Sequence, residues 1–146
     1  MQYPEKVLEQ QNAALLAGAY ILPKVRPVAD ATAKRLLASR SRFETIQNLT
    51  TVPALVTAAI LERECDGNFK CAMCNGEEII GTGHRTTLVP RNRGPYATFE
   101  EGAEDALHLD GLDAVAKRER WTQEAACYFE EAYNGFGVRA HGRHTG

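Results

Sequence analysis

The sequence lacks the features that mark secreted, membrane-spanning and repetitive proteins. Residues 1–6 contain no basic stretch followed by an apolar one, so no signal peptide is expected. The apolar segment 13–22 is interrupted by Gly18 and is too short to span a bilayer. No internal repeat and no low-complexity segment is present. These absences predict a protein that is made in the cytoplasm and has no integral membrane segment.

A strong excess of charge is also lacking. The 146 residues are 44% hydrophobic and 25% charged, with a formal net charge of −2, which argues against a protein that binds nucleic acid over its whole surface. Basic side chains nevertheless gather at 85–93 and at 139–144. The second group forms either a solvated tail or a segment that binds an anionic polymer. The length fits one domain with one core.

Helical periodicity is the main pattern that is present. It predicts helices over about 3–19, 28–47, 53–64, 98–109 and 121–133. Thr98 and Glu101 form a capping-box pattern. Glycine and proline recur over 65–96, where β-like pieces at 78–80 and 86–89 predict at most a short hairpin. We expect a mainly α (α+β) fold, with an N-terminal helix and connector over 1–27 and the principal domain over 28–146.

One predicted helix stands out by its apolar content. Residues 52–61 form an apolar run in which Pro53 suits the first helical position, and the run ends abruptly at Glu62-Arg63-Glu64. Such a helix carries an acidic group from the protein interior to the rim of a cleft. A carboxyl held against apolar neighbours resists ionisation, as general-acid catalysis requires. Alternatively, the charged residues mark where a core helix meets water.

The four cysteines leave two interpretations open. Cys71 and Cys74 have the C-x-x-C spacing of zinc and redox sites. A zinc site needs further ligands, for which the candidates are Cys65, His84 and Cys127. Because no second C-x-x-C and no histidine pair follows, free or disulfide-bonded thiols are favoured, and neither a metal nor a cofactor is predicted.

Several short motifs follow one another over about residues 30 to 140. They are Val52-Pro53, Arg63-Glu64, Asn68-Phe69, Asn75-Gly76-Glu77, Val89-Pro90, Gly94-Pro95, Thr98-Phe99-Glu100-Glu101, Asp105-Ala106-Leu107 and Glu131-Ala132-Tyr133-Asn134-Gly135-Phe136-Gly137. Their order and spacing resemble those of bacteriophage and prophage peptidoglycan hydrolases (endolysins) of the lysozyme-like superfamily. The Ala-Tyr-Asn-Gly motif is also similar to that of lytic transglycosylases and goose-type lysozymes. The chain departs from the family at Cys65 (usually serine), at 72–74 (a His-rich stretch) and at Glu77 (usually aspartate).

The resemblance implies a lysozyme-like fold with a buried central helix, a small loop-rich lobe and late helices that close a cleft. The implied activity is cleavage of the β-1,4 bond between N-acetylmuramic acid and N-acetylglucosamine in bacterial peptidoglycan, with Glu64 as the general acid. For the second catalytic group the chain offers Glu77, or Asp66 as the less favoured choice. A transglycosylase route needs only one acid/base, with a hydroxyl of the substrate as the nucleophile.

Three further residues are candidates for substrate binding. Thr87, or its neighbour Thr86, is placed to orient water or substrate, and Tyr133 and Asn134 are expected to contact the sugars. Without the resemblance, the same residues fit strand-forming threonines, a buried tyrosine and a helix-stop asparagine, and Glu77 fits a solvated turn.

Two other functions stand beside glycan cleavage. One is a lysozyme-like domain that holds a glycan strand without cleaving it, or serves as a phage structural or assembly component. The other is a zinc-stabilised interaction domain. The favoured prediction is an enzyme that another component delivers to the cell wall, free or carried by the virion. We expect its partner to be peptidoglycan and not a nucleic acid. Residues 1–27 are available to dock onto phage proteins.

Overall fold

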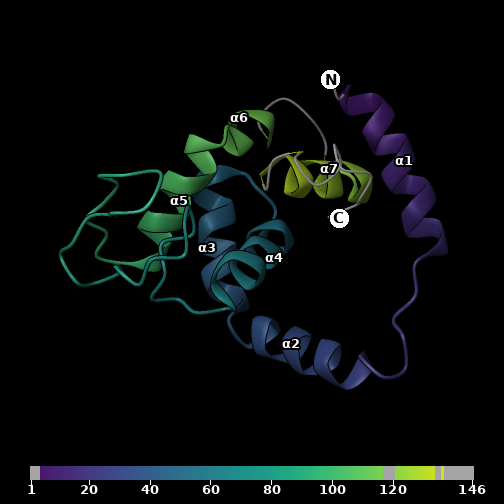
Figure 1. Ribbon diagram of the computed structural model, residues 1–146, viewed down its shortest axis with the longest axis horizontal. Coiled ribbons are helices and arrows are strands. Elements are labelled where there is room, and N and C mark those ends of the chain that lie inside the picture. The colour runs from purple at the N-terminus through teal and green to yellow at the C-terminus, as the bar shows by residue number, and fades with distance from the viewer. Residues whose placement is uncertain (1–3, 117–120, 134–135, 137–146) are drawn as a thin grey trace. The chain divides into compact units, whose positions relative to one another are not determined.

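The computed structural model describes residues 4–116, 121–133 and 136, which form seven α-helices and no strand (Figure 1). The helices are α1 (Glu5–Gly18), α2 (Arg26–Ala38), α3 (Arg40–Thr50), α4 (Ala54–Cys65), α5 (Phe99–Leu109), α6 (Leu112–Ala116) and α7 (Gln123–Tyr133). They belong to two compact units, one of Met1–Ala31 with Arg120–Gly146 and the other of Thr32–Glu119. Within the described part of the chain, no helix has both the length and the apolarity needed to cross a membrane.

The first unit is built on contact between α1 and α7. Phe129 of α7 is buried, and its ring lies 5.1 Å from that of Trp121 and 5.0 Å from that of Tyr128. The predicted late helix is therefore confirmed over Gln123–Tyr133. Its predicted stop at 134–135 and the basic tail at 139–144 lie outside the described residues, and the closing of a cleft by this helix stays a prediction.

The second unit is centred on α4, which packs against α3, and α3 in turn packs against α5. The predicted helix is present, and half of its 12 residues are buried. Its buried residues are Val56, Thr57, Ala58, Ile60, Leu61 and Cys65. Pro53 precedes the helix, and its carbonyl accepts the first helical bond from Thr57 N at 3.2 Å. The apolar run thus places the acidic end of α4 at the edge of a core.

The prediction of one helix over 28–47 is wrong. The chain breaks at Ser39, whose φ of −103° and ψ of 14° separate α2 from α3. The break has a physical reason in burial: α2 buries none of its residues, whereas α3 buries Phe43 and Ile46 against the core. In a single straight helix, the apolar side chains of both halves would lie on one continuous face. Here the apolar side chains of α3 are buried, whereas those of α2 stay accessible to water.

Helix α5 begins as its sequence predicts. Thr98 Oγ1 accepts from Glu101 N at 3.3 Å, and the Glu101 carboxylate accepts from Thr98 N at 3.4 Å, which completes the capping box. Gly102 lets residue 80, in the chain segment that precedes α5, approach closely, since a Cβ on Gly102 would meet Ile80 Cδ1 at 3.0 Å. Arg42 of α3 joins α5 through paired hydrogen bonds to Glu100 at 2.6 and 3.0 Å.

Residues 66–98 form a loop region without strands in the described structure, so the α+β expectation is corrected to an all-helical architecture. The β-like pieces at 78–80 and 86–89 find no partner strand, and turns and side-chain hydrogen bonds order them instead. Ala72, Ile79 and Tyr96 form a small apolar cluster inside the region. Sequence reasoning also missed the short helix α6, which follows Gly111 at a φ of 71°.

Candidate functional site

Glu64 lies in the last turn of α4 and is half-buried, next to the buried Cys65. In the described residues, the Glu64 carboxyl makes no hydrogen bond and no ion pair. Glu62, one half-turn earlier, differs because its carboxylate binds Arg35 Nη2 of α2 at 2.5 Å. Of these two acidic residues, Glu64, the expected general acid, is therefore the one whose carboxyl has no hydrogen-bond or ion-pair partner among the described residues.

The turn at 75–77 is folded against the end of α4. Gly76 has a φ of 76°, and a Cβ on it would lie 3.0 Å from the carbonyl oxygen of Glu64. Gly76 N donates to Ala72 O at 2.8 Å, and Ala72 N donates to Glu77 O at 2.7 Å. This close approach explains the glycine and brings the backbone of Glu77 beside that of Glu64.

The Glu77 carboxylate is surrounded by hydrogen-bond donors. It accepts from Thr87 Oγ1 at 2.6 Å, from Thr87 N at 2.9 and 3.0 Å, from Leu88 N at 2.9 Å and from Asn75 Nδ2 at 2.9 Å. The pKa of Glu77 is lowered, and the largest cause is the hydrogen bond from the Thr87 hydroxyl. Desolvation raises this pKa, but the amides of Thr87 and Leu88 and the Asn75 side chain also lower it, so the net shift is downward. Glu77 thus stays ionised and joins the 75–77 turn to the 86–88 segment.

The alternatives weighed beside Glu77 and Thr87 have different surroundings. Asp66 is exposed and ends α4 in the left-handed conformation, at a φ of 49°. Thr86 is 2% exposed, and its hydroxyl bonds Pro90 O at 2.6 Å and Arg93 N at 3.0 Å. Thr86 therefore organises the loop. Thr87 is exposed, and its hydroxyl donates to the Glu77 carboxylate at 2.6 Å.

Sequence reasoning missed Asp110, which directly follows α5. Desolvation first, and the negative charge of Glu64 second, raise the pKa of Asp110. The end of α5 therefore supplies a carboxyl that lies close enough to Glu64 for the charge of Glu64 to disfavour its ionisation. The sequence indicated only that an acidic residue follows a predicted helix, and acidic residues at helix ends are too common to mark a site.

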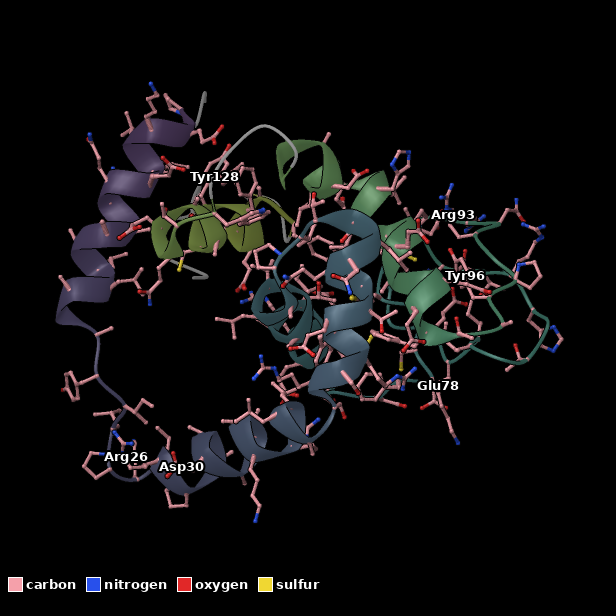
Figure 2. All side chains as sticks on the ribbon, turned by 180° about the vertical axis from the view of Figure 1, so that it is seen from behind. Arg26, Asp30, Glu78, Arg93, Tyr96 and Tyr128 are labelled. Atoms are coloured by element: carbon pink, nitrogen blue, oxygen red, sulfur yellow. The ribbon has the colours of Figure 1, made fainter. Side chains whose placement is uncertain are left out.

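A second polar cluster, also missed, surrounds Asp105 of α5. Arg93 donates to both carboxylate oxygens, and Tyr96 OH donates to Oδ2 at 2.5 Å, so the loop region is tied to α5 (Figure 2). Desolvation opposes ionisation here, but the hydrogen bonds from Arg93 and Tyr96 prevail and lower the pKa of Asp105. Asp105 was visible in the sequence as part of a motif, without any indication of its partners.

The cysteines are free thiols in the described structure. Cys65 and Cys71 are buried and hydrogen-bonded to each other, and desolvation above all raises the pKa of the Cys65 thiol to about 12. Cys74 packs instead against the cluster of Ala72, Ile79 and Tyr96. Across residues 4–116, 121–133 and 136, no three His, Cys, Asp or Glu side chains converge as metal ligands do. The two cysteines of the C-x-x-C motif thus lie in different surroundings, Cys71 beside Cys65 and Cys74 against the apolar cluster.

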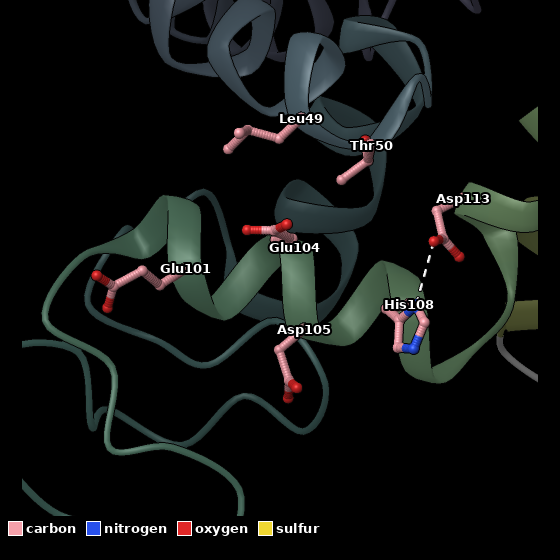
Figure 3. A pocket seen from close by; sticks show the side chains of 7 residues that line it. All are labelled: Leu49, Thr50, Glu101, Glu104, Asp105, His108 and Asp113. Atoms are coloured by element: carbon pink, nitrogen blue, oxygen red, sulfur yellow. Dashed lines mark hydrogen bonds and ion pairs between the residues drawn. The ribbon is translucent and has the colours of Figure 1, made fainter.

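A pocket of about 370 Å³ lies on α3, α5 and α6 (Figure 3). It is strongly acidic, and His108 Nδ1 lies 3.1 Å from Asp113 Oδ2 at one end. The lining residues are Leu49, Thr50, Glu101, Glu104, Asp105, His108 and Asp113. None of the predicted site residues belongs to this set.

The predicted site residues are thus distributed over both units. In the second unit, the Thr87 hydroxyl donates to Glu77, and the turn that contains Gly76 and Glu77 lies near the backbone of Glu64 at the end of α4. Tyr133 is the last residue of α7 in the first unit and is half-buried. Asn134 lies outside the described residues.

Comparison of the chain with protein-family models, curated proteins and solved structures finds no match.

Proposed function

We propose that this protein cleaves the glycan strand of bacterial peptidoglycan at the β-1,4 bond between N-acetylmuramic acid and N-acetylglucosamine, with Glu64 as the general acid. The motifs at 52–53, 63–64, 75–77 and 131–137 suggest a phage-type endolysin. The observation that carries the proposal is the state of the Glu64 carboxyl, which is half-buried and bound to no partner in the described structure. Glu62, by contrast, is paired with Arg35.

In the proposed reaction, the protonated Glu64 carboxyl gives its proton to the glycosidic oxygen as the bond to the anomeric carbon breaks. The resulting oxocarbenium ion is captured either by water or by a hydroxyl of the same sugar. Capture by water needs a second carboxylate, for which Glu77 is the proposed group. Both oxygens of Glu77 already accept hydrogen bonds, and this favours the transglycosylase route, in which Glu64 alone serves as acid and then base.

Substrate binding is proposed for Thr87, Tyr133 and Asn134. Thr87 is exposed beside Glu77, so its side chain adjoins the path of a glycan that reaches Glu64. Tyr133 and Asn134 would stack on and hydrogen-bond to the sugars, as the Ala-Tyr-Asn-Gly motif suggests. The reaction needs no cofactor and no metal. The protein would act at the cell wall, free or on the virion, and residues 1–27 would dock onto phage proteins.

The decisive experiment compares Glu64→Gln with Glu62→Gln on purified peptidoglycan. Glu64→Gln should lower the rate of turbidity loss by at least about a hundredfold, because a general acid contributes that much or more. Its melting temperature should be unchanged or slightly higher, since a functional carboxyl is removed. Glu62→Gln, which loses an exposed ion pair, should keep most of the activity. Equal activity in the two variants would refute the assignment.

The products identify the chemistry. Mass spectrometry of the released fragments distinguishes new reducing ends, which indicate hydrolysis, from 1,6-anhydro ends, which indicate a lytic transglycosylase. Glu77→Gln sharpens this test. If Glu77 is the base, the variant should stop forming new reducing ends, whereas a transglycosylase that uses Glu64 alone should still form 1,6-anhydro ends. The melting temperature should fall in both cases, because the Glu77 carboxylate accepts hydrogen bonds from Asn75, Thr87 and Leu88.

One observation favours a second function, a glycan-binding or phage structural component that does not cleave. The 370 Å³ pocket is formed by α3, α5 and α6 and does not include Glu64. Binding of intact peptidoglycan without release of any fragment by the wild-type protein would establish this alternative.

A further inference from the structure

The loop region presents two apolar side chains to water at 85–91, a segment we call the tip. Leu88 is 57% exposed and Val89 is 79% exposed. A hydrophobic residue alone on a surface is common, but two successive ones at the end of a projecting loop form a small apolar patch. Such exposure can occur in a loop with a fixed structure or in a loop that lacks one.

The hydrogen bonds at the base of the tip show that it is ordered. Thr86 N donates to Arg93 O at 3.0 Å and Asn92 N donates to Thr86 O at 2.9 Å, while the buried Thr86 hydroxyl bridges Pro90 O and Arg93 N. On the other side, the Glu77 carboxylate binds the amides of Thr87 and Leu88. A surface that is held in place before binding loses less entropy on binding.

The tip also carries positive charge that the fold does not neutralise. Arg85 and Arg91 are exposed, and neither forms an ion pair with any described residue. Arg85 Nη1 donates to the backbone oxygen of Asn92 at 3.0 Å, which orients the guanidinium but leaves its charge uncompensated. Arg93 differs, because it is committed to Asp105. The tip therefore suits a ligand that has both a carboxylate and small apolar groups.

The tip is directly connected to the proposed catalytic residue. Leu88 N donates to the Glu77 carboxylate, and Gly76, next in sequence to Glu77, lies near the end of α4, since a Cβ on Gly76 would be 3.0 Å from the carbonyl oxygen of Glu64. A ligand held at the tip is therefore held by the same hydrogen-bonded assembly that adjoins Glu64.

We propose that the tip, through Arg85, Leu88, Val89 and Arg91, binds the carboxylate-bearing peptide side chains of peptidoglycan while the glycan strand reaches Glu64. This inference rests on the proposed function and names the part of the substrate that the tip recognises. The guanidinium groups bind peptide carboxylates, and Leu88 and Val89 contact the methyl groups of the lactyl and alanyl units. An anionic membrane is the other partner that basic and apolar groups fit. Two apolar side chains, however, bury far less area than an interfacial helix does.

The test measures co-sedimentation of the full-length Glu64→Gln protein with purified sacculi, which this variant should leave intact. In this background, Leu88→Ser with Val89→Ser removes the apolar part of the tip, and Arg85→Gln with Arg91→Gln removes its charge. The matched controls are Leu37→Ser with Leu55→Ser, at 67% and 79% exposure, and Lys34→Gln with Lys70→Gln. Each tip variant should bind about tenfold more weakly, which is about 1.4 kcal/mol, and the controls should bind as the parent does.

A chemical arm identifies the ligand group. Conversion of the sacculus carboxylates to amides should weaken binding of the parent to the level of the arginine variant, and should not affect the arginine variant further. Melting temperatures check folding, and Val89→Thr, which keeps the branched shape, replaces any serine variant that melts early. Tip variants that bind as the controls do, or a parent that does not bind sacculi, would overturn the inference. Tip-dependent binding to phosphatidylglycerol vesicles instead of sacculi would assign the tip to a membrane.

Cleavage by the wild-type protein is measured separately, so the two proposals fail in different ways. If the wild-type protein releases glycan fragments but the tip variants bind sacculi as the controls do, the proposed role of the tip is refuted and the proposed enzymatic activity stands. Tip-dependent binding without any fragment release would refute cleavage and leave a peptidoglycan-binding protein.

Discussion

Helix α4 and the loop region 66–98 meet at Glu64, yet different forces order them. The order of α4 comes from apolar burial, with Ile60 2% and Leu61 0% exposed. The loop region has a small apolar cluster and depends on polar side chains that each hold several partners, chiefly Glu77, Thr86 and Asp105. Glu64 therefore lies where an element ordered by apolar burial meets one ordered by hydrogen bonds.

The difference determines how each part should respond to mutation. Apolar burial is shared among many contacts, and its loss scales with the volume removed. A polar side chain with several hydrogen-bond partners behaves differently, because its removal leaves several donors and acceptors unpaired at once. Substitutions should therefore separate the two regions by their cost, their pH dependence and their tolerance of isosteric change.

The largest loss of stability is expected in α4. Leu61→Ala should lower the free energy of unfolding by about 2–5 kcal/mol, since it opens a cavity at a fully buried position. Leu55→Ala on the same helix, where the side chain is 79% exposed, should change it by less than about 0.5 kcal/mol. Urea denaturation followed by circular dichroism measures both. Similar losses would mean that α4 is not the core element.

The next largest effect concerns Asp105. Asp105→Asn should cost about 1.5–3 kcal/mol at neutral pH, because Arg93 and Tyr96 lose a charged acceptor. The pKa of Asp105 is lowered in the folded state, so its contribution is complete above the unfolded value of about 3.9 and is lost as the pH falls through the folded value. The difference between wild type and variant should therefore shrink in acid.

The control for this prediction is Asp30→Asn, which removes an exposed pair with Arg26 at 3.9 Å and should have an effect within about 0.5 kcal/mol. Urea titrations at several pH values measure both variants. A difference between wild type and Asp105→Asn that stays constant down to pH 2 would contradict the assigned role of the carboxylate.

A smaller effect is expected at Thr86. Thr86→Val keeps the side-chain shape but removes the hydroxyl that binds Pro90 O and Arg93 N, and should cost about 1–2 kcal/mol. Thr45→Val removes an exposed hydroxyl that binds Ser41 O and should be nearly neutral. Thermal unfolding compares the two. Because Thr86 also supports the tip, its loss should weaken binding to sacculi as well.

The smallest effect is expected from metal removal. Because hydrogen bonds account for the order of the loop region, a chelator should leave the melting temperature unchanged. Elemental analysis of the purified protein provides the independent check. A marked drop in melting temperature, with about one zinc per chain, would show that the cysteines bind metal.

Local chemistry was predictable from the sequence. The bounds of α4 followed from the apolar run after Pro53, and the start of α5 followed from the capping pattern of Thr98 and Glu101. Both depend on groups within a few residues of each other. The break at Ser39 was not predictable, because a continuous helix satisfies the same local preferences and only burial of Phe43 and Ile46 distinguishes the two arrangements.

The candidate site divides in the same way. Neighbouring residues alone indicate that an apolar helix ends in Glu64 and that glycine follows Asn75 at a turn. Three other facts became visible only in the folded chain. Glu62 is paired while Glu64 is not, Thr87 and Leu88 donate to the Glu77 carboxylate, and the charge of Glu64 adds to desolvation in raising the pKa of Asp110. Those facts depend on residues at least ten positions apart in the chain, and hydrogen bonds and charges act through space irrespective of sequence distance.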